Sequence, residues 1–399
     1  MKILIVNNFY TPNIVGGGEK SVQSLAEGLV KSNNEVYVVT MSLSDSQNES
    51  KLNGVNIFYL PVLGNKVSPL KEDRRLIERV FWQLSTEFNR GFISRFESLL
   101  NVIKPDVIHT NNLTGLSRSI WRLAALKNIP CVHTLRDYFL MCSRGSLFKN
   151  GKTCDTRCNS CRVLTFNRKV SSYSVKAVVG NSEFILQQHL DAGFFKDSVI
   201  QSVVFSSSAQ LANNEMSDKL NKKSKDIKIG FIGRFHETKG LPVLFKALKS
   251  IPQKGWKLLV AGKGSLSGQN ISHNNIDHEQ VEWLGWTEPE DFFSRIDVLV
   301  VPSTWHDPLP RVIFEAYMHG IPVIASNRGG CPEIVDIGET GWVFNPDFPD
   351  ELSQILLNLI NEPKLFDEMR SKCLQKSKLF SQENNVASYQ EVYNNIVNN

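Results

Sequence analysis

Short apolar runs rich in β-branched residues alternate with longer segments of helical periodicity along most of the chain. Residues 19–32, for example, place Val22, Leu25, Ala26 and Leu29 at the spacing of a helix with one buried face. Repetition of strand and helix in this way predicts parallel sheets covered by helices on both faces. The predicted strands are residues 2–6, 36–40, 55–60, 106–109, 130–134, 177–179, 227–232, 256–261, 281–284, 298–301 and 322–325.

The alternation is interrupted at residues 206–226, which are polar and lack an apolar period. We interpret this segment as a linker between an N-terminal domain, residues 1–205, and a C-terminal domain, residues 227–375. A chain of 399 residues is long for one core, so two domains are expected. Residues 376–399 predict a terminal helix with an apolar stripe that must pack on another element, made of Val386, Tyr389, Val392, Tyr393 and Ile396.

The bulk composition is that of a globular protein, with 41% hydrophobic and 21% charged residues. The net charge of +5 permits an anionic small molecule or membrane surface as partner, and we predict no nucleic-acid partner. No run approaches the ~20 apolar residues that span a bilayer, and the first apolar run is too short for a signal peptide. We therefore expect a cytoplasmic protein whose contact with a membrane would be peripheral.

The stretch GRFHETKG follows the predicted strand at 227–232. It places Arg234 and Lys239 five residues apart, directly after Gly233. A strand end that leads into a helix favours negative charge, and two cations there could clamp a phosphate. The alternative is a turn with solvated charges, in which Glu237 pairs with one of the cations.

Two acids, Asp307 and Glu315, enclose a proline-bounded loop that opens a predicted helix. A buried glutamate near a helix start can accept two hydrogen bonds from a ribose diol, although exposed glutamates are common in helices. The later Gly329, Gly330 and Glu333 strengthen the interpretation as a nucleotide site. The loop residues whose backbone could add to an anion site are Leu309, Pro310 and Arg311.

Three consecutive glycines, Gly16, Gly17 and Gly18, lie between a predicted strand and a predicted helix. Glycines there allow a ligand to approach the backbone and the free N–H groups of the helix start. Their spacing is not that of the dinucleotide fingerprint. A flexible turn explains this loop as well as a binding loop does.

Four of the seven cysteines, Cys142, Cys154, Cys158 and Cys161, fall within twenty residues. Thiolates at such spacing can share a structural zinc ion. Nearby arginines and lysines would favour thiolates, but the cluster contains no histidine. Free thiols and a redox role are the alternatives, whereas a disulfide framework is not expected of this chain.

Taken in order, these motifs resemble those of the family 4 retaining glycosyltransferases, also called glycosyl transferases group 1. The family's Y-x-P and G-G-x-E loop, its D-V-I-H strand end and its T-L-H-D-Y-W segment are similar to residues 10–19, 106–109 and 134–139. The G-R-x4-K-G motif corresponds to residues 233–240, and the E-x7-E motif with its downstream segment resembles residues 307–325. N-S, G-G-x-x-E-x-V and T-G-x-x-F correspond to residues 181–182, 329–335 and 340–344.

The resemblance implies the GT-B fold: two Rossmann-like domains that face each other across a cleft, with the terminal helix crossing back to the first. It also implies a nucleotide-sugar donor and an acceptor that is a glycan or lipid-linked. In the family, Arg234 and Lys239 would bind the diphosphate, helped by backbone N–H groups of Leu309, Pro310 and Arg311. Glu315 would hold the ribose and Asp307 the donor sugar, and the loop Gly16, Gly17, Gly18 would reach the donor phosphate and the acceptor.

The implied chemistry is retaining hexosyl transfer in which the departing phosphate takes the acceptor proton. Cations stabilise the leaving group, so no cofactor or catalytic metal is expected. Two departures from the family matter. Asp307 replaces a glutamate, and Arg136 replaces the histidine of T-L-H-D. Because arginine cannot act as a base, His109 and Asp137 remain candidates beside Arg136, which could bind a sugar, a phosphate or an acidic acceptor.

These departures leave an alternative open, namely a GT-B protein that binds a nucleotide sugar as a sensor or partner subunit without transferring it. An epimerase of similar fold is a further alternative, but the acid pair at 307 and 315 is not its pattern. The sequence does not identify the base, the sugar or the acceptor.

Overall fold

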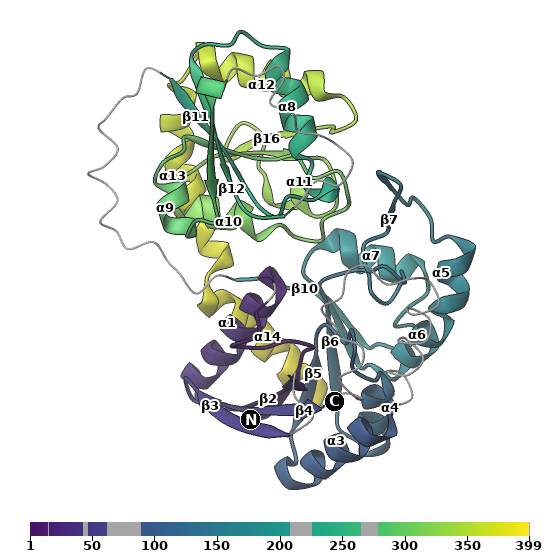
Figure 1. Cartoon of the computed structure of the whole chain (residues 1–399). Coiled ribbons are helices and arrows are strands. Elements are labelled where there is room, and N and C mark those ends of the chain that lie inside the picture. Colours follow the sequence, from purple (N-terminus) through teal and green to yellow (C-terminus); the bar gives the residue numbers. More distant parts are fainter. Residues whose placement is uncertain (15, 43–46, 62–88, 208–225, 265–277, 399) are drawn as a thin grey trace. The chain divides into compact units, whose positions relative to one another are not determined.

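The structure is a computed structural model that describes residues 1–14, 16–42, 47–61, 89–207, 226–264 and 278–398 (Figure 1). The predicted linker therefore lies almost entirely outside the described residues. The chain divides into two compact units. Unit 1 contains Met1–Gly145, Arg157–Ser207 and Gln382–Asn399, and unit 2 contains Ser146–Thr156 and Ser208–Ser381.

Unit 1 is built on an eight-stranded sheet with the order β10-β9-β6-β5-β1-β2-β4-β3. Neighbouring strands are parallel except the edge pair β3 and β4, which is antiparallel. The strands are β1 (Lys2–Val6), β2 (Glu35–Ser42), β3 (Asn48–Leu52), β4 (Val55–Pro61), β5 (Val107–Thr110), β6 (Cys131–Leu135), β9 (Ala177–Gly180) and β10 (Ile200–Val203). The register is set at the centre, where Ile3 lies opposite Val36 on one side and Val107 on the other.

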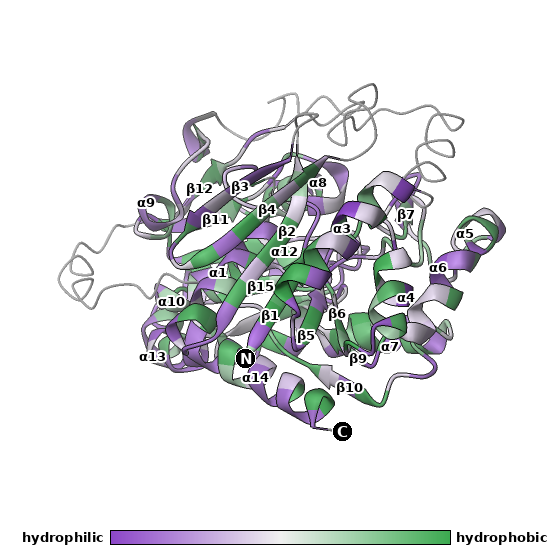
Figure 2. Cartoon of the chain, turned by 90° about the horizontal axis from the view of Figure 1, so that it is seen from below, coloured by the Kyte–Doolittle hydropathy of each residue, from purple (hydrophilic) through white to green (hydrophobic). Residues whose placement is uncertain are grey.

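The described helices of unit 1 include α1, whose buried face is the predicted one. A capping box begins this helix, because the Glu19 carboxylate accepts from the Gly16 amide at 2.8 Å. The hydropathy colours show apolar residues on the strands and on the inner helix faces (Figure 2). The helices are α1 (Gly17–Lys31), α3 (Arg90–Ile103), α4 (Ser119–Leu126), α5 (Asn159–Leu164), α6 (Phe166–Ser171), α7 (Glu183–Asp191) and α14 (Gln382–Val397).

Unit 2 has a six-stranded, wholly parallel sheet with the order β13-β12-β11-β14-β15-β16. Its strands are β11 (Ile227–Ile232), β12 (Trp256–Ala261), β13 (Val281–Gly285), β14 (Val298–Val301), β15 (Val323–Ser326) and β16 (Gly341–Phe344). Its helices are α8 (Leu241–Lys249), α9 (Pro289–Phe293), α10 (Arg311–Met318), α11 (Cys331–Ile334), α12 (Pro349–Asn361) and α13 (Leu365–Ser377). The small hairpin β7 (Phe148–Lys149) and β8 (Lys152–Thr153) is grouped with this unit.

All eleven predicted strands are present, with ends that shift by at most two residues, and the two parallel α/β layers are confirmed. Strands β3, β10 and β16 were not predicted. In β3 every residue is exposed and most are polar, so the sequence carries no alternation to detect. Pairing with β4 holds this edge strand in place. No helix in the described part of the chain is both long and apolar enough to cross a membrane.

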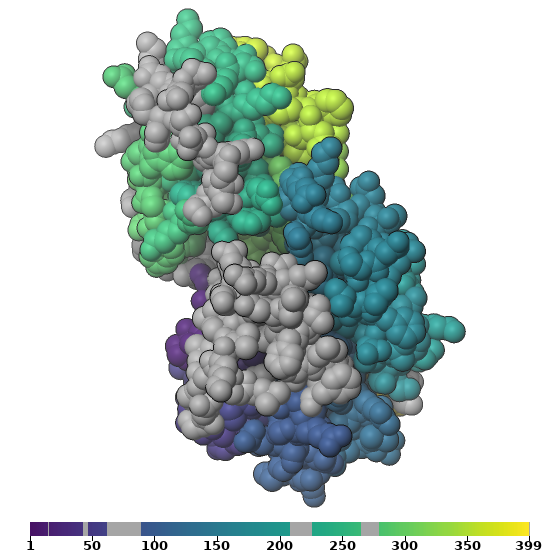
Figure 3. All heavy atoms as spheres, turned by 45° about the vertical axis from the view of Figure 1, so that its right-hand side comes forward, coloured from purple at the N-terminus to yellow at the C-terminus, as the bar shows by residue number. Residues whose placement is uncertain are grey.

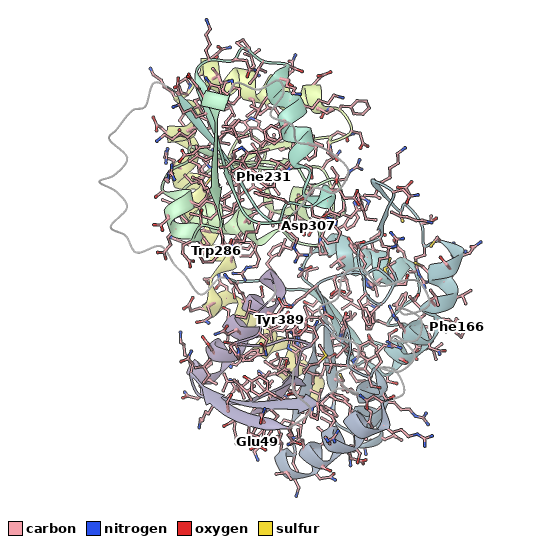
Figure 4. The ribbon with its side chains drawn as sticks, in the orientation of Figure 1. Glu49, Phe166, Phe231, Trp286, Asp307 and Tyr389 are labelled. Atoms are coloured by element: carbon pink, nitrogen blue, oxygen red, sulfur yellow. The ribbon has the colours of Figure 1, made fainter. Side chains whose placement is uncertain are left out.

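Helix α14 returns the chain to unit 1, where its apolar stripe joins the core. A buried polar network fixes it to the sheet. His109 Nδ1 lies 2.7 Å from the Tyr393 hydroxyl, and His109 Nε2 lies 2.7 Å from Thr134 Oγ1. Thr134 Oγ1 is in turn 2.9 Å from the hydroxyl of Tyr389, which Figure 4 labels. The network explains how polar groups are tolerated at this interface, since each has a partner.

The prediction of a catalytic role for His109 is therefore wrong. Its side chain is 0% exposed and both ring nitrogens are hydrogen-bonded. Burial is the main cause that lowers its pKa well below the usual value. A neutral, enclosed imidazole cannot contact a substrate, and its role is to position α14.

Two further histidines are buried in unit 1. Burial lowers the pKa of His133 to about 3 and that of His189 to about 4. All three histidines therefore stay neutral in the folded state at pH values where an unfolded histidine becomes charged. Asp137 acts in the opposite direction, because burial raises its pKa to about 6.

We predict that unit 1 loses stability as the pH falls below about 6.5. The unfolded state then takes up protons that the folded state refuses, at about 1.4 kcal/mol per pH unit for each histidine. Asp137 offsets part of this loss below its own pKa. Calorimetry at pH 7.5 and 5.5 should show a melting temperature lower by about 5 °C or more at the acidic pH.

His189→Asn serves as the control for this experiment. The Nε2 atom of His189 has no hydrogen-bond partner in the described part of the chain, so its removal should cost little at neutral pH. The variant should reduce the pH slope by about one third. Equal melting temperatures at the two pH values would contradict the assignment of neutral buried histidines.

Candidate active site

In unit 2, the turn after β11 lies tightly against the end of β14. Gly240 has a φ of +69°, and a Cβ atom there would be 1.7 Å from the carbonyl oxygen of Pro302. Only glycine fits this approach without displacement of the backbone. Hydrogen bonds reinforce it, because the Thr304 amide donates to the Thr238 carbonyl at 3.0 Å and its hydroxyl donates to the Glu237 carbonyl at 2.8 Å.

This close approach brings Lys239 to Asp307, although 68 residues separate them in the sequence. Lys239 Nζ donates to Asp307 Oδ2 at 2.6 Å. The Asp307 side chain is nearly buried, whereas that of Lys239 is 32% exposed. Asp307 is labelled in Figure 4. The structure thus joins the phosphate motif and the first acid of the acid pair in one site.

The glycine pair at 329 and 330 supports Asp307 from behind. Gly329 has a φ of +61°, and a Cβ atom there would lie 2.1 Å from the Asp307 carbonyl oxygen. The Gly330 amide donates to the same oxygen at 2.9 Å. The motif G-G-x-x-E therefore fixes the backbone of the acid, which explains why two glycines follow the next strand.

The second acid lies one helical turn into α10. Its first residue, Arg311, donates to Glu315 Oε1 through Nε at 3.2 Å and through an Nη at 3.1 Å. Pro310 is the N-cap of this helix, and Leu309 is buried just before it. The sequence had assigned only a backbone role to Arg311. Its side chain also orients the carboxylate, and the i,i+4 spacing on a helix was the signal for this pair.

The remaining predicted residues of the motif are arranged around these pairs. Gly233 closes β11, since its amide donates to the Ala261 carbonyl at 3.1 Å, and Arg234 is exposed in the turn that follows. Strands β11 and β14 are parallel neighbours, so their carboxyl ends share one edge of the sheet. Ligands of open parallel sheets bind outside this edge. The site can therefore bind an anion with two kinds of group, mobile cations and hydrogen-bond-accepting acids.

In unit 1, the glycine loop leads directly into α1. Gly16 has an extended backbone with a φ of −159°, and Gly17 and Gly18 are helical. A Cβ atom at Gly18 would meet no atom within 4 Å. The fold itself therefore does not require glycine at these two positions, 16 and 18, in contrast to Gly240. Open space next to the amides of a helix start is the arrangement that an approaching ligand needs.

A second part of unit 1 forms an open hollow of about 260 Å³ at the ends of β5 and β6. Asp137 lines it. Its carboxylate accepts from the Asn112 amide group at 2.8 Å and from the Phe139 backbone amide at 2.7 Å. Burial raises its pKa to about 6, which suits a group that exchanges protons near neutral pH. The sequence named Asp137 as a candidate without assigning it a role.

Arg136 lines the same hollow and is half-buried. Its Nε donates to Asn111 Oδ1 at 3.0 Å, and one Nη donates to Ser206 Oγ at 2.7 Å. Its charge also helps to keep His109 neutral. The arginine is therefore held in a fixed orientation, and the hydroxyl of the unusual serine segment after β10 contributes to it.

The structure does not gather the four cysteines. Cys142 Sγ and Cys161 Sγ lie 3.9 Å apart, and Cys158 is exposed at the N-cap of α5. A hydrogen bond with Ser160 is the main cause that lowers the pKa of Cys158 to about 7. Cys154 belongs to the hairpin of unit 2. The described residues contain no group of three or more potential ligands placed to hold a metal, so the zinc site stays a prediction without geometric support.

Family models match both halves of the chain. Residues 15–200 match the model "Glycosyltransferase Family 4", and residues 212–379 match "Glycosyl transferases group 1". An uncharacterized 42.6 kDa protein of the cps region of Klebsiella pneumoniae is 31% identical over 84% of this chain and 87% of its own length. The D-inositol 3-phosphate glycosyltransferase of Corynebacterium glutamicum is 25% identical over 96% of this chain and 93% of its own.

Solved structures agree on the fold. Sucrose-phosphate synthase of Thermosynechococcus elongatus has a TM-score of 0.76 at 18% identity and covers 99% of this chain and 98% of its own. HepE of Anabaena, in complex with UDP and glucose, has a TM-score of 0.69 at 18% identity and covers 99% of both chains. With two Rossmann-like units, motif residues joined in one site and family models over both halves, this chain belongs to the family 4, group 1 glycosyltransferases of the GT-B fold.

Proposed function

We propose that the protein is a retaining glycosyltransferase that uses a UDP- or GDP-sugar. It moves the sugar to a hydroxyl group of a glycan or lipid-linked acceptor in polysaccharide or cell-envelope biosynthesis. The observation that carries this proposal is the pairing of Lys239 with Asp307 and of Arg311 with Glu315 at one sheet edge. The cps region of the Klebsiella relative and the UDP-glucose complex of HepE support the pathway class and the donor class.

In this proposal, the donor diphosphate binds Arg234 and Lys239 and the helix start at Leu309, Pro310 and Arg311. The Lys239–Asp307 pair is partly exposed, so it contributes no more than about 1 kcal/mol. A diphosphate with two negative charges can therefore replace Asp307 as the partner of Lys239. The released carboxylate is then available to accept hydrogen bonds from hydroxyl groups of the donor sugar, while Glu315 accepts from the ribose.

The proposed reaction breaks the bond between the sugar's anomeric carbon and the diphosphate oxygen. The acceptor oxygen forms its bond to the same carbon on the same face, and its proton passes to the departing phosphate. Charge develops on the leaving group, where Arg234 and Lys239 stabilise it. These cations supply the electrostatic role that a divalent ion would otherwise have, so we propose that transfer is independent of metal.

The first prediction of this proposal concerns the cation clamp. Titration calorimetry with UDP-, GDP- and ADP-sugars should show tight binding of one nucleotide class. Lys239→Ala and Arg234→Ala should each weaken it by roughly 100-fold, because a charge-assisted hydrogen bond contributes about 1.5–3 kcal/mol. Lys246→Ala, which removes an exposed cation of α8, is the matched control and should bind normally. Unchanged affinity in Lys239→Ala would refute the clamp.

Turnover separates the proposal from a binding protein without activity. With the donor identified, transfer to acceptor glycans should occur in the presence of EDTA, and NMR should show the donor's anomeric configuration in the product. Inversion or dependence on a divalent ion would contradict the mechanism. Donor binding without turnover on any acceptor would favour the sensor or partner subunit, and conversion of donor alone would favour an epimerase.

A second prediction contrasts two glycines. Gly18→Ala should leave the melting temperature unchanged or slightly higher, because alanine favours the helix and its Cβ atom meets nothing. If the glycine loop contacts a substrate, the same variant should lower kcat/KM. Gly240→Ala should instead lower the melting temperature, since its Cβ atom would overlap the Pro302 carbonyl. A stable Gly240→Ala protein, or full activity in Gly18→Ala, would refute the respective role.

A further inference from the structure

Helices α5 and α6 of unit 1 expose three large apolar side chains. Val163 is 76% exposed, Phe166 62% and Val170 48%. Phe166 and Val170 are four residues apart on α6 and so share one face, and Val163 precedes Phe166 by three residues. The stick view shows Phe166 at the outer edge of its unit (Figure 4). We call Val163, Phe166 and Val170, with the neighbouring cations Arg162 and Lys169, the α5–α6 patch.

The patch is held in place from its buried side. Arg168 of α6 is 2% exposed. Its guanidinium stacks on the Phe139 ring at 4.0 Å and donates to the Phe139 carbonyl. Thr165, between the two helices, is fully buried and donates to the Cys161 carbonyl at 2.7 Å. Polar anchors therefore occupy the inner face, and the apolar side chains point outward as a consequence of the local fold.

The charge of the chain is concentrated around this patch. Residues 157–182 contain five of the 45 basic residues and none of the 40 acidic ones. The remaining 40 basic residues balance the 40 acidic residues, so this segment alone accounts for the net charge of +5. Its basic residues are Arg157, Arg162, Arg168, Lys169 and Lys176. In Figure 3 this blue-green part of the chain forms an open face of the surface.

We propose that the α5–α6 patch docks the protein on an anionic lipid surface. Phenylalanine and valine side chains can enter the boundary between headgroups and acyl chains, and the cations beside them meet lipid phosphates. Charge complementarity selects this partner. A stable protein interface needs about 800 Å² on each side, which three side chains on two short helices do not supply. The proposal extends the proposed function, because a lipid-linked acceptor lies at such a surface.

The test is co-sedimentation of the full chain with vesicles. We expect binding to vesicles with about 30% phosphatidylglycerol and little binding to pure phosphatidylcholine. Binding should weaken as NaCl rises from about 0.05 to 0.5 M. Cys158 is the exposed one of the seven free cysteines and lies next to the patch, so a fluorescent maleimide there should report a less polar environment on binding.

Variants assign the binding to the patch. Val163→Glu/Phe166→Glu and Arg162→Glu/Lys169→Glu should each weaken vesicle binding by roughly tenfold or more. The matched controls place the same changes elsewhere on unit 1. Val102→Glu/Leu126→Glu alters equally exposed apolar residues, and Lys104→Glu/Arg122→Glu alters exposed cations of α3 and α4. Both controls should bind like the wild type.

Donor titration on the same variants separates this proposal from the proposed function. All four variants should keep normal nucleotide-sugar affinity, which also shows that they are folded. Equal binding to both vesicle types, no binding to either, or patch variants that bind like their controls would overturn the membrane proposal and leave the transferase proposal intact. Patch-dependent capture of a purified protein without vesicle binding would overturn it in favour of a protein partner.

Discussion

The candidate site depends on a close approach between backbones at the carboxyl edge of the unit 2 sheet. Gly240 allows the turn after β11 to touch the segment after β14, and Gly329 allows the next loop to touch Asp307 from the other side. A side chain at either glycine would force these segments apart. The 2.6 Å pair between Lys239 and Asp307 exists because both approaches are made at once. The chemistry of the motif therefore rests on what its glycines exclude.

The same site shows how charged groups are kept ready for a ligand. Each acid of the pair is held by a cation, Asp307 by Lys239 and Glu315 by Arg311. Such partly exposed pairs are weak in water, so a nucleotide diphosphate can exchange with them at low cost. Preorganised charges of this kind stabilise a leaving group without reorganisation during the reaction. Stability of the fold comes from the apolar layers on the sheets, and the ion pairs serve the site.

Unit 1 uses its polar residues differently. The network that joins His109, Thr134, Tyr389 and Tyr393 is fully buried and fixes α14 on the sheet. At the opposite extreme, the α5–α6 patch leaves apolar and basic side chains in the open. The net charge of the whole chain resides in that segment, which places a surface property, and not a property of the donor site, behind the basic isoelectric point.

Much could be predicted from the sequence by itself. Apolar runs with β-branched residues determined the strands, because parallel strands are buried on both faces, and ordered motifs indicated the family and the residues of the donor site. The tertiary structure decided which of those residues meet. It paired Lys239 with Asp307, added the side chain of Arg311 and turned His109 from a candidate catalyst into a support for α14. Burial and long-range contact arise only when distant segments pack, and local sequence patterns carry neither.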